Sequence, residues 1–179
     1  MLIEVIVIGL VVQLFFWKQE TFQIKYLPAI IICFFALLGL RLVISSHPEI
    51  SQGIYQAQGF LILGLSLIFF LQKPRLAYIP FGLGLFLNGL MLSMYGRMPV
   101  DGEALLVAGQ DQVLTSLIQN QSTTHFLMTG GIQSLLGDII PLPKTYPLAR
   151  VVSPGDILMS LGLTYLLIVR PIVKEREND

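Results

Sequence analysis

The sequence has few charges, one cysteine and no surplus of either charge. Only 12% of its 179 residues are charged, and the 11 basic residues equal the 11 acidic residues in number. Without a basic surplus, we do not expect nucleic acid as a partner, nor electrostatic attachment to an anionic lipid surface. The single cysteine, Cys33, lies in an apolar run and cannot form an internal disulfide. We interpret it as a packing or lipid-facing residue.

Common catalytic and metal-binding motifs are missing as well. The chain contains no His-Glu-x-x-His, Cys-x-x-Cys or Gly-x-Ser-x-Gly pattern. The usual sequence signs of zinc, thiol and serine-hydrolase sites are therefore lacking, and we expect no metal and no cofactor. We find no internal repeat, so the sequence gives little support to a transporter built from inverted repeats.

Apolar residues, in contrast, make up 54% of the chain, above the share typical of water-soluble domains. They gather in runs that approach the roughly 20 residues a helix needs to cross a hydrocarbon core. We predict an all-α fold class, an integral membrane bundle of about five transmembrane helices in one domain. The predicted spans are residues 2–17, 27–45, 54–71, 76–95 and 155–170. Membrane lipid is the expected partner, and other membrane proteins are further candidates.

The distribution of lysine and arginine predicts an orientation, because basic residues in short loops favour the cytoplasmic side. Seven lie after the first or fifth predicted span or between the third and fourth: Lys18, Lys25, Lys73, Arg75, Arg170, Lys174 and Arg176. Four lie on the other side: Arg41, Arg97, Lys144 and Arg150. We therefore predict a multi-pass protein of a bacterial cytoplasmic membrane, with its N-terminus outside and its C-terminus in the cytoplasm.

A long segment separates the fourth and fifth predicted spans, and we call residues 96–154 the cap segment. Loops of this length usually carry function or structure of their own. Apolar residues recur at helical spacing over 102–118 and 124–136, which predicts short amphipathic helices on the extracytoplasmic side. Asp101 is the predicted N-cap of the first helix. The proline-rich run 140–147 predicts extended or turned chain.

The residues best suited to chemistry lie in the cap segment and where it meets the last span. Asp138 and Asp156 each stand between a glycine and an isoleucine at the expected membrane face. Two carboxylates that share a proton activate water in aspartyl hydrolysis. Histidine is the usual proton carrier near neutral pH. Asp138, Asp156 and His125 are therefore the candidate catalytic residues.

A structural interpretation of the same residues is also open, and we favour it. Asp156 follows Ser153 at the expected start of the last helix, where an acid stabilises the positive end of the helix dipole. Asp138 could instead form an ion pair with Arg97 or Arg150. The expected polar cluster, with His125 at its edge, consists of Arg97, Asp138, Arg150 and Asp156. Asn88, the deepest polar residue of the spans, is expected to hydrogen-bond a neighbouring helix.

Three motifs occur in order along the chain: Gly96-Arg97-Met98-Pro99-Val100, Leu136-Gly137-Asp138-Ile139-Ile140-Pro141-Leu142-Pro143 and Ser153-Pro154-Gly155-Asp156-Ile157. In these residues the chain resembles a family of small bacterial multi-spanning membrane proteins grouped as a domain of unknown function. The resemblance covers nearly the whole chain and implies a bacterial membrane location without an assigned activity. Family members often carry Asn-Gly-Gly directly before Arg-Met-Pro, whereas Asn88 lies further back here.

Three classes of function are compatible with these residues. A structural or accessory component of a membrane assembly needs no special residue, and we favour this class over an enzyme. A membrane-embedded acid–base hydrolase of the aspartyl type, acting at the outer face, requires Asp138 and Asp156 in one site. A small carrier or lipid-binding protein requires a polar cavity.

Overall fold

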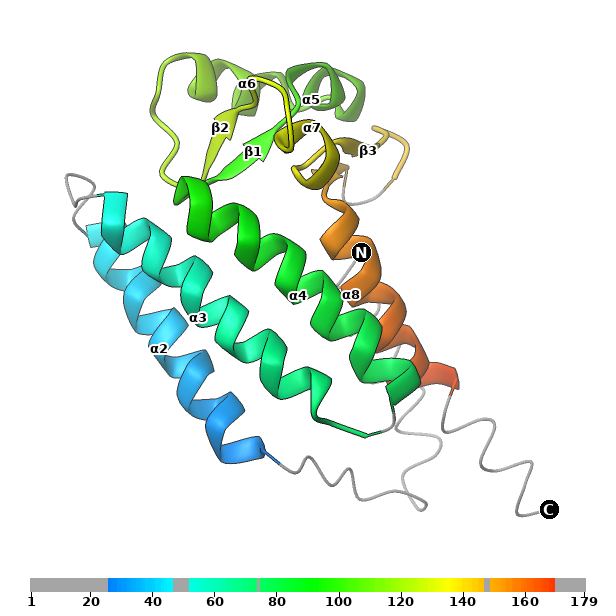
Figure 1. The fold of residues 1–179 in the computed structure, drawn as a ribbon. Helices are drawn as coiled ribbons and strands as arrows, with labels where there is room; N and C mark the ends of the chain where they lie inside the picture. Colours follow the sequence, from blue (N-terminus) through cyan, green and yellow to red (C-terminus); the bar gives the residue numbers. More distant parts are fainter. Residues whose placement is uncertain (1–25, 47–51, 74, 147–148, 170–179) are drawn as a thin grey trace.

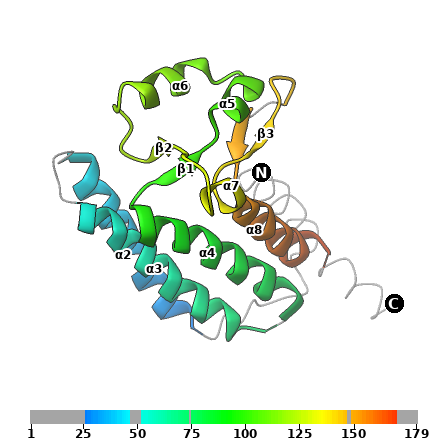
Figure 2. The ribbon, with the colours of Figure 1, turned by 45° about the horizontal axis from the view of Figure 1, so that its top comes forward.

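The computed structural model describes residues 26–46, 52–73, 75–146 and 149–169, which form a helical bundle with the cap segment at one end (Figure 1). The bundle consists of α2 (Leu27–Ser46), α3 (Gln52–Phe70), α4 (Arg75–Tyr95) and α8 (Pro154–Thr164). A π-helical stretch, η1 (Tyr165–Val169), continues α8. Helix α4 packs between α3 and α8, and α2 lies along α3 (Figures 1 and 2).

Three of these helices are long and apolar enough to cross a membrane. The qualifying stretches are Leu27–Ile44, Gly53–Phe70 and Tyr78–Tyr95, which agree closely with the predicted spans 27–45, 54–71 and 76–95. The first predicted span, 2–17, lies outside the described residues. The fifth, 155–170, overlaps α8 and η1 and is not among the three. The structure thus supports a membrane protein with three such helices.

The outer faces of these helices suit contact with lipid. Large apolar side chains are exposed along them, and in water they would lose the free energy that apolar burial provides. They include Ile31, Ile32, Phe34, Phe35, Leu38 and Leu42 on α2, Phe60 and Leu67 on α3, and Leu83 and Phe86 on α4.

The cap segment is built from short elements that follow one another in quick succession. They are β1 (Met98–Val100), α5 (Gly102–Ala108), α6 (Asp111–Ile118), β2 (His125–Leu127), α7 (Gln133–Leu136), β3 (Ile140–Leu142) and β4 (Arg150–Val152). Strands β1 and β2 are parallel, with Met98 opposite His125. Strands β3 and β4 are antiparallel, and an isolated bridge joins Val100 to Asp138.

A small hydrophobic core holds the cap segment together. Val100, Leu105 and Leu117 are buried in it, and they come from β1, α5 and α6. Partly buried side chains from α6, β2 and β4 pack against them, namely Leu114, Leu127 and Val151. The cap segment therefore has packing of its own and is not merely a loop laid over the bundle.

Two predictions for the cap segment are corrected by the structure. The fold is mostly helical, but the segment also contains four three-residue strands that the all-α prediction did not include. The predicted helix 102–118 is divided in two, since Gly109 takes a left-handed conformation (φ 70°) and ends α5. As predicted, Asp101 is the N-cap of α5 and accepts a hydrogen bond from Glu103 N at 3.1 Å. The run 140–147 begins as the extended strand β3.

The predicted amphipathic helix 124–136 is wrong over most of its length. His125–Leu127 is a strand, and only Gln133–Leu136 is helical. Gly130 and Gly131 adopt positive φ values of 109° and 69°, which interrupt a right-handed helix. Strand β1 also offers residues 125–127 backbone partners that helical periodicity alone does not reveal.

Candidate functional site

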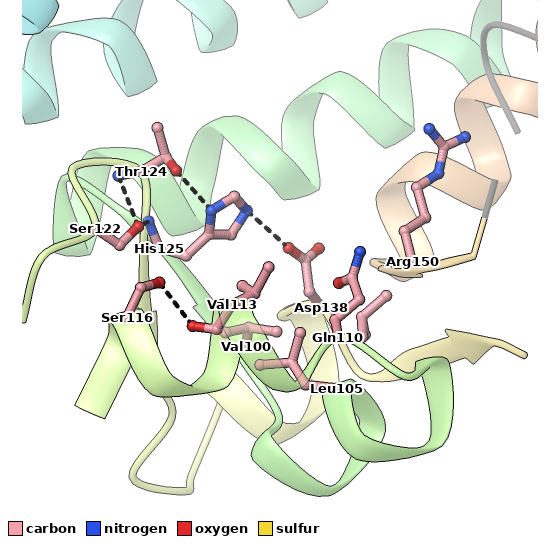
Figure 3. Close-up of a pocket in the computed structure, with 11 residues that line it drawn as sticks. Val100, Leu105, Gln110, Val113, Ser116, Ser122, Thr124, His125, Asp138 and Arg150 are labelled. Carbon is pink, nitrogen blue, oxygen red and sulfur yellow. Dashed lines mark hydrogen bonds and ion pairs between the residues drawn. The ribbon is translucent and has the colours of Figure 1, made fainter. Parts of the chain in front are cut away.

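A cavity of about 440 Å³ lies within the cap segment, and all of its lining residues belong to that segment (Figure 3). Part of its wall is apolar and adjoins the small core: Val100, Leu105, Val113 and Val151. The rest is polar: Gln110, Ser116, Ser122, Thr124, His125, Asp138 and Arg150. A mixed lining of this kind can hold a molecule with both polar and apolar parts.

His125 and Asp138 meet at the wall of this cavity. The distance from His125 Nε2 to Asp138 Oδ2 is 3.3 Å. Strand β1 brings the two residues together, because β2 pairs with one of its edges while Val100 bridges to Asp138. The backbone fixes Asp138 in place: its N–H donates to Pro99 O at 2.8 Å, and its carbonyl accepts from Asp101 N at 2.9 Å.

The other ring nitrogen of His125 contacts a hydroxyl group. Thr124 Oγ1 lies 2.7 Å from His125 Nδ1. One tautomer satisfies both contacts: Nε2–H donates to Asp138, and Nδ1 accepts from the Thr124 hydroxyl. Ser122 Oγ fixes the preceding turn by accepting from the backbone N–H groups of Thr124 and His125, at 3.4 and 3.2 Å. The result is a continuous hydroxyl–imidazole–carboxylate chain, shown in Figure 3.

The two ends of the His125–Asp138 pair differ in exposure. The Asp138 side chain is only 10% exposed, whereas the His125 side chain is 40% exposed. Burial raises the pKa of the Asp138 carboxyl above its ordinary value of 3.8, and the nearby charge of Asp156 adds to this. The hydrogen bond and the charge of His125 oppose the rise in pKa. The carboxylate is therefore shielded from water while the imidazole can be reached from the cavity.

Asp156 takes part in a different network, where α4 meets α8; we call Asn88, Ser153, Gly155 and Asp156 the junction. Ser153 Oγ accepts from Asp156 N at 3.0 Å, and Ser153 N donates to Asp156 Oδ2 at 3.3 Å, which forms a capping box. Asn88 Nδ2 donates to Asp156 Oδ1 at 2.9 Å, and Ser153 Oγ donates to Asn88 Oδ1 at 2.9 Å. Among the described residues, Asp138 and Asp156 share no hydrogen-bond partner.

The close approach of α4 and α8 at the junction depends on glycine. A Cβ at Gly155 would overlap Asn88 Oδ1 and approach the backbone oxygen of Gly84. A larger residue would therefore push α8 away from α4 and separate Asn88 from its two partners. This arrangement is that of a structural brace between helices.

The two arginines of the expected cluster have different surroundings. Arg97 Nη1 donates to Ser122 O at 3.0 Å, and its guanidinium lies 5.8 Å from the Phe126 ring centre. Arg97 thus supports the turn that presents Thr124 and His125. Arg150 begins β4 and lines the cavity, with its guanidinium turned away from Asp138 (Figure 3).

The sequence indicates His125 and Asp138 as candidate residues but gives no such indication for Thr124. Thr124 is the first residue of the predicted helix 124–136, and a threonine before an apolar run is a common helix start. Its signal is the Thr-His neighbourhood itself, which is too short to be specific. Within the described part of the chain, no group of three or more histidine, cysteine or acidic side chains is placed to hold a metal ion.

Comparison with known proteins gives a family but no activity. No curated protein and no solved structure matches the chain. A family described as a family of unknown function (DUF5317) matches residues 2–168. Because this match includes the described bundle helices, the cap segment and the junction, the protein belongs to the DUF5317 family of unknown function.

Proposed function

We propose that the protein is a membrane-anchored hydrolase whose active site is the cavity of the cap segment, with His125 as general base. The observation that carries the proposal is the chain from the Thr124 hydroxyl through His125 to Asp138 on the cavity wall. A nucleophile in hydrogen-bond contact with a base, which a third group orients, is a recurring arrangement in covalent catalysis. The proposal replaces the aspartyl-type hydrolase, because Asp138 has a histidine partner while Asp156 is part of the junction.

The proposed reaction assigns one task to each group. Thr124 Oγ attacks the carbonyl carbon of an ester or amide while its proton passes to His125 Nδ1. Asp138 accepts the Nε2–H hydrogen bond and stabilises the imidazolium that forms. The imidazolium then protonates the leaving alcohol or amine. Water completes the cycle: it gives a proton to Nδ1, attacks the acyl-threonine, and the proton returns to Thr124.

An accessory role in a membrane assembly, which the sequence favours, accounts for the bundle and the junction. An accessory role does not explain the cavity, where both ring nitrogens of His125 contact polar side chains of the protein. A lipid-binding protein would use the cavity but would not need proton transfer. A protein that binds a ligand in the cavity but turns over no substrate would therefore be a lipid-binding protein and not a hydrolase.

We also propose that the cap segment lies outside the cytoplasm, as the distribution of basic residues predicts. In support, the α3–α4 turn that carries Lys73 lies at the end of the bundle opposite the cap segment (Figure 1). Gln112 is exposed on α6 and is suited to labelling. In a Cys33→Ser background, Gln112→Cys should react with a membrane-impermeant maleimide on intact cells. Reaction only after cell lysis would reverse the orientation.

The activity is tested with the full chain in lipid nanodiscs and a panel of p-nitrophenyl acyl esters and anilides. Wild-type protein should hydrolyse at least one probe, and His125→Gln should lower kcat/KM by about 10²–10⁴-fold, the usual contribution of a general base. His47→Gln is the matched control, because His47 is the other of the two histidines in the sequence. Equal turnover by the His125→Gln variant and wild type would rule out the proposed base.

A further inference from the structure

The short helix α7 lies beside α4 and the start of α8. Helix α7 contacts both α4 and α8, and both views place it next to the start of α8 (Figures 1 and 2). We call residues 129–136 the α7 foot. Two of its large apolar side chains are exposed: Ile132 at 40% and Leu135 at 68%. Such side chains are unfavourable in water, so the position of the foot relative to the membrane matters.

Ile132 and Leu135 are exposed because the opposite side of the foot, which carries Gln133, faces the protein. Gln133 is only 6% exposed, and its Oε1 accepts a hydrogen bond from Thr129 N at 2.8 Å. Gly137 N donates to Gln133 O at 2.9 Å and closes the other end of the helix. Because Gln133 faces the protein, the neighbouring positions 132 and 135 are turned outward.

The α7 foot contains no charged residue, and in this it differs from the other exposed apolar surface of the cap segment. No aspartate, glutamate, lysine or arginine occurs between His125 and Asp138. Leu106 on α5 is also exposed, at 50%, but α5 and α6 carry Glu103 and Asp111 in their first turns. These two helices lie on the side of the cap segment away from the bundle (Figure 1). Charged groups are costly in lipid, so among the described residues of the cap segment only the α7 foot is suited to contact with lipid.

We propose that the α7 foot is a membrane-contact site, in which Ile132 and Leu135 insert into the lipid leaflet next to α4 and the start of α8. The exposed surface of the foot adjoins the bundle helices whose outer faces carry exposed leucine, isoleucine and phenylalanine. Interfacial helices bury their apolar face about 5–10 Å into the boundary between headgroups and acyl chains. The contact holds the cap segment at a fixed height above the bilayer, and it does not depend on the hydrolase proposal.

Tryptophan fluorescence tests the insertion directly, because the chain contains one tryptophan that can be removed by Trp17→Phe. In that background, Leu135→Trp and the matched control Leu106→Trp are each reconstituted into phosphatidylcholine bilayers with brominated acyl chains. We expect at least about twofold stronger quenching of Leu135→Trp than of Leu106→Trp, because bromine quenches only a ring within the acyl region. Acrylamide in the water should give the reverse order.

Equal quenching of the two variants by brominated lipid, or stronger quenching of Leu106→Trp, would overturn the proposal. Ile132→Trp provides a second position on the same face, for use if Leu135→Trp unfolds at a lower temperature than its parent. Both foot positions must respond to brominated lipid. Weak quenching of a correctly folded Ile132→Trp variant would place the foot in water.

Discussion

The cavity and the junction each contain an aspartate in the same local sequence, Gly-Asp-Ile, yet the two carboxyl groups have different environments. Asp138 is buried against His125 at a cavity, while Asp156 accepts hydrogen bonds from Asn88 and from the backbone at the start of α8. One carboxylate therefore orients a reachable imidazole, and the other joins two helices. Local sequence sets the residue type, but the neighbouring element decides its role.

The largest expected effect separates the two acids by activity. Asp138→Asn should lower kcat/KM for the ester probe by about 10²–10⁴-fold, because the imidazole loses the charge that stabilises its protonated form. Asp156→Asn is the matched control and should keep the wild-type rate while unfolding at a lower temperature. Steady-state kinetics on both variants in nanodiscs provides the measurement. Equal loss of activity in the two variants would return both acids to one site.

The next largest effect concerns the helix contact at the junction. Gly155→Ala should lower the free energy of unfolding by about 1–3 kcal/mol, since its Cβ would overlap Asn88 and force α8 to shift. Gly64→Ala on α3 is the control, because a Cβ there meets nothing within 4 Å. That change should be neutral or stabilising by up to about 1 kcal/mol through helix propensity. Thermal unfolding in detergent measures both, and a similar loss in the two variants would contradict close packing at Gly155.

A smaller effect is expected from the helix N-cap at the junction. Ser153→Ala removes the hydroxyl that accepts from Asp156 N and donates to Asn88, and should cost about 0.5–2 kcal/mol. Ser46→Ala is the comparison, since the Ser46 hydroxyl donates to Leu42 O within its own helix. Ester hydrolysis should be unchanged in both. A Ser153→Ala variant as stable as Ser46→Ala would leave the capping box without a measurable contribution.

The smallest effect is a pH dependence of stability at Asp138. Burial raises the pKa of the Asp138 carboxyl in the folded protein above its ordinary value of 3.8. As the pH rises above about 3.8, the carboxyl therefore loses its proton in the unfolded chain before it does so in the folded protein. The free energy of unfolding contributed by Asp138 therefore falls as the pH rises through this window. Asp138→Asn removes that loss, and its stability relative to wild type should increase from pH 4 to pH 7. The effect is small because His125 opposes the rise in pKa.

Thermal unfolding of wild type and Asp138→Asn at the two pH values measures this difference. A relative stability that decreases with pH would mean that the interaction with His125 outweighs burial. In that case the carboxylate at the cavity would stabilise the fold as well as orient the imidazole.

The parts of the structure that were predictable follow from local rules. Long apolar runs gave the three helices at 27–46, 52–70 and 75–95, because hydrophobic length alone marks a helix that can cross a membrane. Asp101 and the Ser153–Asp156 pair lie where side-chain capping predicts helix starts, since a cap involves residues only two or three positions apart. These interactions need no information from the rest of the chain.

The parts that were not predictable depend on segments that are distant in sequence. Residues 125–127 are a strand only because β1 pairs with them, and His125 reaches Asp138 only because both flank β1. Such non-local pairing overrides the helical spacing of apolar residues. The aspartyl-hydrolase alternative required Asp138 and Asp156 in one site, but Asp156 accepts a hydrogen bond from Asn88, which lies on another helix.

The sequence by itself determined that the protein contains long apolar helices with a polar cap segment between them, because hydrophobic run length and helix capping are local properties. Only the tertiary structure decided which polar groups meet. The partners of Asp138 and Asp156 are set by the pairing of β1 and by the close approach of α4 and α8, and both bring together residues far apart along the chain.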